Sequence, residues 1–322
     1  MAKPLVAFYW CASCGGCEEA VVDLAEDILK VVDAVDIRLW PVAMDFKYKD
    51  IEAMPDNALA VSFINGAIRT EEQEHIAKLL RQKSQLVVAF GACAHLGGIP
   101  GLANVANKKE IFETAYKLTH TTANPKGVYP KTVTEIPQGK LTLPDFYDTV
   151  KSLDQTIDVD YYLPGCAPPP DLIMKAFTAI LEGKLPEKGA VLTVDKALCE
   201  TCERNKSKPD KLVIKEVKRI SEVIADPEKC FLAEGIICLG PATRGGCGER
   251  CINANMPCRG CFGPTKEVKD MGAKFLSSLA SIIDIDDEKE IEKVAKSVID
   301  PIGLFYMYSL PSSILRRKQG VV

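Results

Sequence analysis

Cysteine is the residue that most constrains this chain, because its 322 residues include thirteen cysteines and only three histidines. The N-terminal residues lack the pattern of a signal peptide, so we expect a cytoplasmic protein. Thiols in the cytosol seldom pair into disulfides. Cysteines in this number are instead typical of zinc or iron–sulfur sites. The sequence therefore predicts a fold built around metal bound by thiolates.

The remaining composition is that of a globular protein. Hydrophobic residues make up 47% of the chain and charged residues 26%. The net charge of -4 offers no basic excess for binding nucleic acid. No apolar run reaches the length of a membrane span. We expect one large or two ordinary domains, no nucleic-acid partner and no membrane span.

Strands and helices are predicted to alternate over residues 4–166. Such alternation predicts an α/β fold with a five-stranded, flavodoxin-like parallel sheet, in which ligands lie beyond the carboxyl ends of the strands. Residues 117–150 are expected to form an inserted loop or hairpin. The predicted strands cover 5–10, 35–40, 58–64, 86–91 and 158–163, and the predicted helices cover 18–32, 71–81 and 170–181.

A second domain is predicted after residues 182–189, which are rich in Pro, Gly and Lys. We therefore expect a flavodoxin-like domain over residues 1–183 and a smaller, irregular iron–sulfur domain over residues 184–322. Eight of the thirteen cysteines fall in the second domain, where bound metal would supply much of the stability. A charged helix is predicted over 287–298, and the apolar run 303–310 is expected to pack on the domain or on a partner.

Four cysteines of the first domain follow predicted strands. Because parallel strands end at one edge of a sheet, the fold would gather these thiols, and four thiolates can hold a cubane cluster. Separate buried thiols and a zinc site are the alternatives. Cys11 is left over and is interpreted as a spare thiol. The four residues are Cys14, Cys17, Cys93 and Cys166.

The eight cysteines of the second domain are enough for two sites of four. Division by chain order assigns Cys199, Cys202, Cys230 and Cys238 to one site, and Cys247, Cys251, Cys258 and Cys261 to the other. Two Cys-x2-Cys pairs with further cysteines between them are a strong metal signal. Spacing alone leaves zinc open, but a third site in the first domain favours iron–sulfur clusters, since three clusters form a path for electrons.

These motifs resemble those of the small subunit of nickel–iron hydrogenases, of the F420-non-reducing (methyl-viologen-reducing) type associated with heterodisulfide reductase. The resemblance covers nearly the whole chain. It rests on Cys14-Gly-Gly-Cys17, Gly-x-Cys93-x4-Gly-Gly, Pro-Gly-Cys166-x-Pro-Pro, Cys199-Glu-Thr-Cys202, Ile237-Cys238-Leu-Gly-Pro and Pro257-Cys258-Arg-Gly-Cys261-Phe-Gly-Pro. The Ala that follows Cys166 departs from the family pattern, as does the additional thiol of Cys11.

The resemblance implies three 4Fe-4S clusters that carry electrons from a nickel–iron centre in a partner large subunit, whose own nickel-binding motifs this chain lacks. It assigns the first-domain cysteines to a proximal cluster, Cys247, Cys251, Cys258 and Cys261 to a medial cluster, and the remaining four to a distal cluster. We call these groups the proximal, medial and distal sets. The expected acceptor is an iron–sulfur or flavin protein, such as a heterodisulfide reductase complex.

Glu18, directly after a proximal cysteine, is a candidate proton relay, with an ordinary helix-start glutamate as the alternative. His95, two residues past Cys93, is expected to be a satisfied loop histidine. Two other functions stay open at this point. One is a hydrogenase-like relay subunit of another oxidoreductase complex without nickel chemistry, and the other is a zinc-stabilised interaction module.

Overall fold

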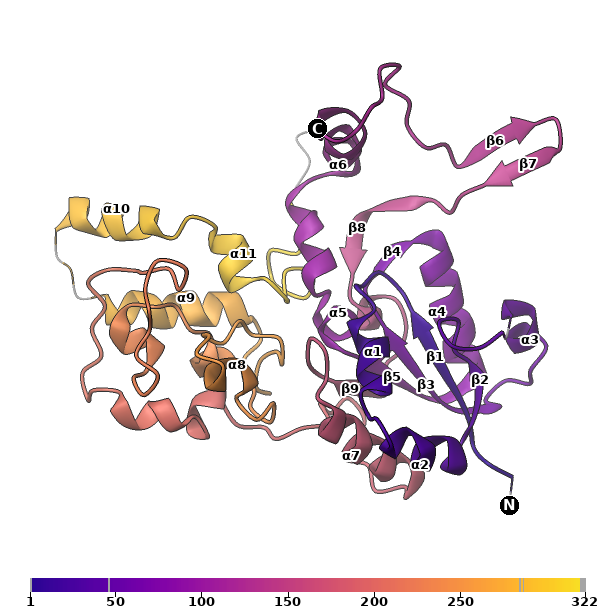
Figure 1. Ribbon diagram of the computed structural model, residues 1–322, viewed down its shortest axis with the longest axis horizontal. Coiled ribbons are helices and arrows are strands. Elements are labelled where there is room, and N and C mark those ends of the chain that lie inside the picture. Colours follow the sequence, from indigo (N-terminus) through magenta and orange to yellow (C-terminus); the bar gives the residue numbers. More distant parts are fainter. Residues whose placement is uncertain (1, 46, 284, 286, 319–322) are drawn as a thin grey trace.

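The computed structural model describes residues 2–45, 47–283, 285 and 287–318. Figure 1 shows two lobes, which we call the sheet lobe (β1 to α7) and the cysteine-rich lobe (η4 to α11). The sheet lobe contains a parallel sheet with strand order β2-β1-β3-β5-β9, which confirms the predicted flavodoxin-like topology. Its strands are β1 (Leu5–Trp10), β2 (Asp36–Leu39), β3 (Leu59–Asn65), β5 (Ser84–Phe90) and β9 (Tyr161–Leu163).

Both faces of the sheet are buried, as expected for apolar strands that read as continuous hydrophobic runs. Alternate residues of each strand point to opposite faces, so that Phe8 and Phe63 stack on one face with ring centroids 5.2 Å apart. Phe177 packs on Phe63 at 4.7 Å from the same side. That face is covered by α1 (Gly16–Val22), α2 (Asp27–Ala34) and α7 (Pro170–Leu181), and the other by α3 (Tyr48–Glu52), α4 (Glu71–Lys83) and α5 (Ala92–Leu96).

Two predicted elements differ from the structure. The single helix expected over 18–32 is two helices, α1 and α2, separated by turns in which Ala25 adopts a left-handed backbone with φ 52°. Leu24 and Val31 stay buried on either side of the break, so the helical spacing of apolar residues in the sequence does not reveal the break. The strand expected over 158–163 begins only at Tyr161.

The predicted insertion contains a hairpin. Strands β6 (Val133–Ile136) and β7 (Gly139–Thr142) are exposed throughout and project from the sheet lobe (Figure 1). Strand β8 (Phe146–Lys151) then returns and pairs antiparallel with β4 (Ile68–Thr70). Short helical segments precede the hairpin and follow β8. They are η1 (Ile99–Val105), α6 (Lys108–Glu113), a turn of π-helix η2 (Thr114–Leu118) and η3 (Leu153–Gln155).

The cysteine-rich lobe consists of loops and short helices around its own apolar core, in line with the expected irregular domain. Phe275 and Phe305 pack at 5.7 Å in that core. None of the described helices is both long and apolar enough to cross a membrane. The helices of this lobe are η4 (Leu198–Glu200), η5 (Glu203–Ser207), η6 (Phe231–Glu234), η7 (Gly240–Ala242), α8 (Arg250–Asn253), α9 (Met271–Ile282), α10 (Glu288–Ser297) and α11 (Pro301–Phe305).

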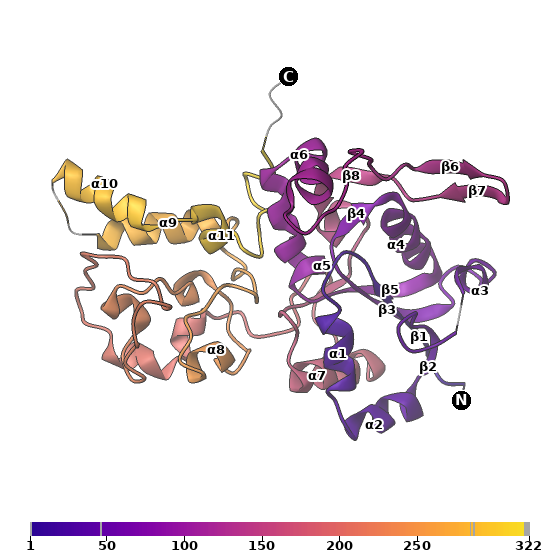
Figure 2. The same ribbon diagram turned by 45° about the horizontal axis from the view of Figure 1, so that its top comes forward.

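After α11 the chain returns to the sheet lobe, as Figures 1 and 2 both show. Pro311 fits against Gly97 and Gly101, where a side chain on either glycine would collide with it. Arg317 forms an ion pair with Asp148 at 2.5 Å. The C-terminal segment thus fastens the second lobe to the first.

A buried carboxylate fixes the start of β9. Asp160 is 6% exposed, and its side chain accepts hydrogen bonds from the Val87 amide at 2.8 Å, from Arg81 at 2.5 Å and from Lys188 at 2.6 Å. Because the Val87 amide donates its hydrogen bond to this carboxylate, the regular pairing of β5 with β9 starts only at Tyr161. Burial would raise the pKa of Asp160, but the bonds from Lys188, Arg81 and Val87 hold it below its usual value.

We predict that Asp160→Ala lowers the free energy of unfolding by about 2 kcal/mol, because it leaves a buried amide and two cations without their acceptor, although both cations keep some access to water. Anaerobic urea unfolding followed by circular dichroism measures this. Asp158→Ala, two residues earlier at an exposed position, is the control and should change little. Equal unfolding midpoints for the two variants would contradict this account.

Candidate metal sites

The structure brings the proximal set together at one edge of the sheet. Cys14 lies in the turn from β1 into α1, Cys17 lies in the first turn of α1, Cys93 lies in α5 just after β5, and Cys166 follows β9. Burial raises the pKa of the Cys17 thiol, and the other three thiols of the set raise it further. Four thiols from three strand ends therefore lie within electrostatic range of one another, at the edge where the strand pattern placed them.

Glycines leave the space that these sulfur atoms need. Gly91, which directly follows β5, has φ +86°, a conformation that favours glycine. A Cβ at Gly91 would collide with the sulfur of Cys17, and one at Gly98 would collide with that of Cys93. The Ile99 amide also donates a hydrogen bond to the Cys93 thiol. The loops are thus shaped around sulfur.

The distal set lines a single cavity in the cysteine-rich lobe. Leu198, Phe231, Leu232 and Ile252 supply apolar walls to the cavity. Burial raises the pKa of Cys199 to about 12, with contributions from the other three thiols of the set. A Cβ at Gly240 would lie 3.2 Å from the sulfur of Cys199, so this glycine also keeps space beside a thiol. The four cysteines around the cavity are Cys199, Cys202, Cys230 and Cys238.

The medial set lies around α8 and the loop that follows it. Burial raises the pKa of Cys261 to about 12, and Cys251 and Cys247 are among the thiols that add to the shift. Burial also raises the pKa of Cys258, and Cys238 of the distal set contributes more to this shift than Cys261 does. The structure thus brings these four cysteines into one neighbourhood.

The medial set also touches both of the others. Cys166 of the proximal set contributes more than any other thiol to the raised pKa of Cys261, which places the medial set beside the proximal one. On the other side, the Cys258 amide donates to the Cys238 sulfur at 3.3 Å. The sets therefore follow one another in the order proximal, medial, distal.

The residues present fit a sulfur-bound metal group. Each set offers four thiols, the donor chemistry of iron–sulfur clusters and of some zinc sites. The space kept by Gly91 and Gly240 and the amides aimed at sulfur suit such a group. In the part of the chain that the structure describes, no three His, Cys, Asp or Glu side chains form a ready site for a single metal ion.

Glu18 differs from an ordinary helix-start glutamate because it is only 3% exposed. Its two carboxylate oxygens accept hydrogen bonds from the Trp40 indole and the Asn65 amide. Burial raises the pKa of Glu18, and these two bonds act in the opposite direction. The carboxylate therefore lies inside the sheet lobe, next to a proximal cysteine, and its role in proton transfer stays a prediction.

Two further residues from the sequence analysis have clear positions. Cys11 is buried, and burial alone raises its pKa, which agrees with a spare thiol. His95 lies in α5 with its ring 4.7 Å from that of Tyr162, but its buried Nδ1 has no hydrogen-bond partner among the described residues. Burial, with Arg244 nearby, lowers the pKa of His95 to about 3. The expectation of a satisfied loop histidine was wrong.

Sequence reasoning missed two side chains that lie near the cysteine sets. The Thr243 hydroxyl donates to the Leu239 carbonyl at 2.6 Å in the loop that carries Cys238, and Tyr308 lies within electrostatic range of Cys166. Thr243 follows the Cys238 motif closely in the sequence, so it could have been recognised as a neighbour of the cysteines. Tyr308 is far from Cys166 in sequence, and no local pattern points to it.

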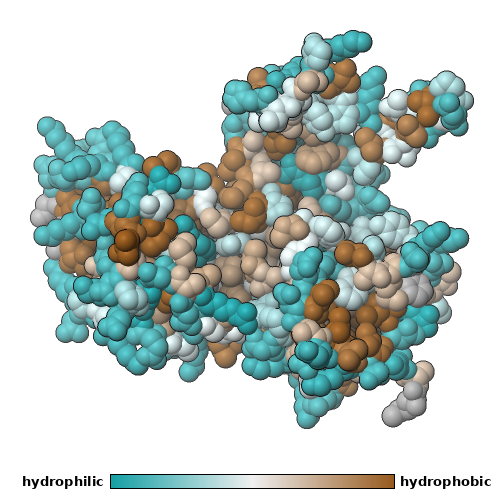
Figure 3. Space-filling view, in the orientation of Figure 1, coloured by the Kyte–Doolittle hydropathy of each residue, from teal (hydrophilic) through white to brown (hydrophobic). Residues whose placement is uncertain are grey.

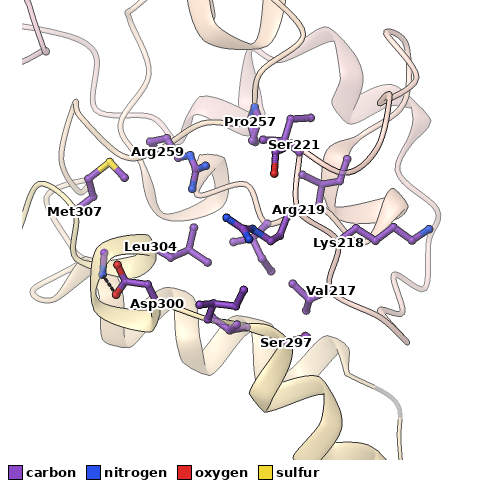
Figure 4. Close-up of a pocket in the computed structure, with 16 residues that line it drawn as sticks. Val217, Lys218, Arg219, Ser221, Pro257, Arg259, Ser297, Asp300, Leu304 and Met307 are labelled. Carbon is purple, nitrogen blue, oxygen red and sulfur yellow. Dashed lines mark hydrogen bonds between the residues drawn. The ribbon is translucent and has the colours of Figure 1, made fainter.

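A separate cavity of about 410 Å³ opens beside the medial set. Figure 4 shows the guanidinium groups of Arg219 and Arg259 directed into this space, with Asp300 and Met307 on its far side. Arg259 stands between Cys258 and Cys261 in the sequence. No cysteine lines this cavity, so it is distinct from the three sets.

Comparisons with known proteins agree with this arrangement. Residues 14–180 match the family described as NADH ubiquinone oxidoreductase, 20 Kd subunit. The chain is 42% identical to the iron–sulfur subunit of the F420-non-reducing hydrogenase of Archaeoglobus profundus, over 97% of this chain and 98% of the relative. It is 38% identical to a subunit of the F420-non-reducing hydrogenase of Methanothermobacter thermautotrophicus, over 98% and 97%.

A solved structure shares the fold. The NiFeSe hydrogenase from Desulfovibrio vulgaris Hildenborough superposes with a TM-score of 0.51 and 18% identity, over 83% of this chain and 95% of that chain. The solved structure supports the fold alone, whereas the sequence similarity along nearly the full length of both relatives supports membership of their family. The chain is a subunit of an oxidoreductase and belongs to the family of F420-non-reducing hydrogenase small subunits.

Proposed function

We propose that this chain is the electron-transfer subunit of a cytoplasmic nickel–iron hydrogenase. It would carry electrons from a nickel–iron centre in a large subunit, through three 4Fe-4S clusters, to an acceptor protein. The observation that carries the proposal is the order in which the three cysteine sets lie next to one another: proximal, medial, distal. Twelve thiols in three neighbouring groups suit a path across the molecule, and a single structural site would need only four of them.

The chain's own residues would hold and separate the redox groups. When bound, each cluster supplies one-electron chemistry at a potential that its surroundings set. The cysteines bind iron, and amides such as those of Ile99 and Cys258 donate to sulfur. The distal cavity offers a lining that is largely apolar, with Arg204 and Asn205 also in its wall. Glu18 is the candidate for moving a proton beside the proximal set.

The large subunit would cover the edge of the sheet that carries the proximal set. Cys14 and Cys166 are exposed there, which leaves the edge accessible to a partner. Figure 3 shows apolar side chains gathered in the region of α1 and α2, where Val22, Leu29 and Val32 are exposed. Exposed apolar patches often mark protein interfaces. The relatives named above are themselves described as hydrogenase subunits.

The acceptor would approach the distal set at the other end of the path. We propose an iron–sulfur or flavin protein, such as part of a heterodisulfide reductase complex. A relay subunit without nickel chemistry in its partner, and a zinc-stabilised interaction module, are the alternatives. Metal content and hydrogen-dependent activity distinguish these three.

We predict about twelve iron atoms per chain after anaerobic purification, since three four-iron clusters are expected. Elemental analysis with acid-labile sulfide measures this directly. Stoichiometric zinc with little iron would contradict the cluster proposal and favour the interaction module. About four or eight iron atoms in a fully folded chain would mean that the number of clusters is wrong.

The purified complex should reduce methyl viologen with hydrogen as the electron donor, because the partner subunit is expected to hold nickel. The measurement is anaerobic dye reduction under hydrogen compared with argon. A complex with intact clusters and a full-length large subunit but without hydrogen-dependent reduction would favour the relay of another oxidoreductase.

Gly91→Ala should remove the proximal cluster selectively. The added Cβ collides with the Cys17 sulfur, so we expect iron to fall from about twelve toward about eight atoms per chain. Gly189→Ala is a matched control, because Gly189 has the same φ of +86° but open space around its Cβ position. An equal loss of iron from the two variants would show that the backbone conformation, and not the space beside sulfur, decides whether the cluster is held. Full iron content in Gly91→Ala would contradict the prediction.

A further inference from the structure

The cavity of about 410 Å³ beside the medial set has the size of a small-molecule site. Most of its wall is apolar, with side chains such as Ile220, Ile237 and Leu304. Small-molecule sites combine such a wall with a few polar groups that fix the orientation of the ligand. The lining comes from four stretches of the cysteine-rich lobe, within residues 217–221, 236–237, 257–259 and 297–307.

Two positive charges face this cavity with little to neutralise them. The guanidinium groups of Arg219 and Arg259 are directed into it from two different loops (Figure 4). Arg259 is half-buried, and within the part of the chain that the structure describes it has no hydrogen bond or ion pair. Arg219 pairs with Glu222 at 3.9 Å, and both of these side chains are exposed. A long ion pair at the surface contributes little, so both guanidinium groups can accept a further partner.

The carboxylate in the lining serves another purpose. Asp300 caps α11, because its Oδ1 accepts a hydrogen bond from the Gly303 amide at 2.8 Å. Figure 4 shows this bond on the far side of the cavity from Arg219 and Arg259. Among the described residues, Asp300 forms no ion pair with either arginine. Positive charge therefore dominates the side of the cavity that the two arginines share.

Backbone hydrogen bonds hold the loops that carry both arginines. Next to Arg259, the Cys258 carbonyl accepts a hydrogen bond from the Leu239 amide at 2.9 Å. In the other loop, the Lys218 amide donates one to the Gly235 carbonyl, also at 2.9 Å. A ligand therefore does not have to order these loops, which lowers the cost of binding.

We propose that this cavity binds an organic phosphate, with the phosphate between Arg219 and Arg259 and the apolar body of the ligand against the wall. A guanidinium is a planar fork that donates two parallel hydrogen bonds to a phosphate or a carboxylate. The two oxygens of a carboxylate fill one fork, whereas the terminal oxygens of a phosphate can accept from two forks. A phosphate monoester also carries between about −1.5 and −2 charges at neutral pH, which matches two guanidinium groups.

This site goes beyond the proposed function, because it lies outside the three cysteine sets and requires no electron transfer. Isothermal titration calorimetry with n-butyl phosphate tests it on the anaerobically purified complex, in a buffer free of phosphate and sulfate. We expect saturable binding. Inorganic phosphate should bind more weakly because it lacks the apolar body, and butyrate because it serves only one guanidinium. No binding of n-butyl phosphate, or equal or tighter binding of either comparison anion, would overturn the proposal.

Arg219→Gln and Arg259→Gln should each weaken the binding of n-butyl phosphate roughly tenfold, because each removes one charged donor. Arg250→Gln is the matched control. Arg250 also stands next to a medial cysteine, but it pairs with Asp171 at 3.4 Å and does not line the cavity. Its substitution should leave binding unchanged. Unweakened binding in Arg219→Gln, or equal weakening in Arg250→Gln, would overturn the proposal.

Iron content is measured for every variant before binding is compared. Arg219 is exposed and lies outside the cysteine motifs, so we expect Arg219→Gln to keep its fold and its iron. This variant decides the test if Arg259→Gln loses iron from the medial set. Wild-type protein that binds n-butyl phosphate at this site but contains no iron would defeat the proposed function and support the phosphate site.

Discussion

The common edge at which the parallel strands end is the constraint on which the rest of this structure depends. Strands β1, β5 and β9 each run into a loop or short helix that carries proximal cysteines, so the hydrogen-bonded ladder fixes the separations of these segments. Strand β3, which lies between β1 and β5, contributes no cysteine. It ends in Asn65, which binds both Ser13 and Glu18 and so holds the first cysteine loop against the sheet. The geometry of the site is therefore a property of the sheet.

The second lobe is held in place from both of its ends. Where the chain leaves the sheet lobe, the Leu192 amide donates a hydrogen bond to the Tyr162 carbonyl at 2.8 Å. This bond fastens the departing chain to the edge of β9. Where the chain returns, Asn104 hydrogen-bonds to the Arg316 carbonyl at 2.9 Å. Because two anchors restrict a lobe far more than a single linker does, the junction of the proximal and medial sets has a defined geometry. Electron transfer between two redox sites requires such a fixed separation.

Local sequence patterns were sufficient for the parallel sheet and for the strand-end position of the proximal cysteines, because both follow from short apolar runs that end in glycine and cysteine. They were insufficient where tertiary contacts override the pattern. The break at Ala25 lacks a Gly or Pro signal, and β9 is shortened by the carboxylate of Asp160, whose partners come from other elements. The hydrogen bond from the Gly98 amide to the Tyr308 carbonyl joins the two lobes, so no local motif contains it.

The chain order of the second-lobe cysteines is the reverse of their spatial order. The distal set spans residues 199–238 and comes first in the sequence, but the medial set, residues 247–261, is the one that contacts Cys166. The chain therefore passes through the distal set before it returns through the medial set. This route places the Cys258–Cys261 loop next to the sheet lobe shortly before α9 begins at Met271. The C-terminal segment can then reach the sheet lobe at Gly98 without a long connection.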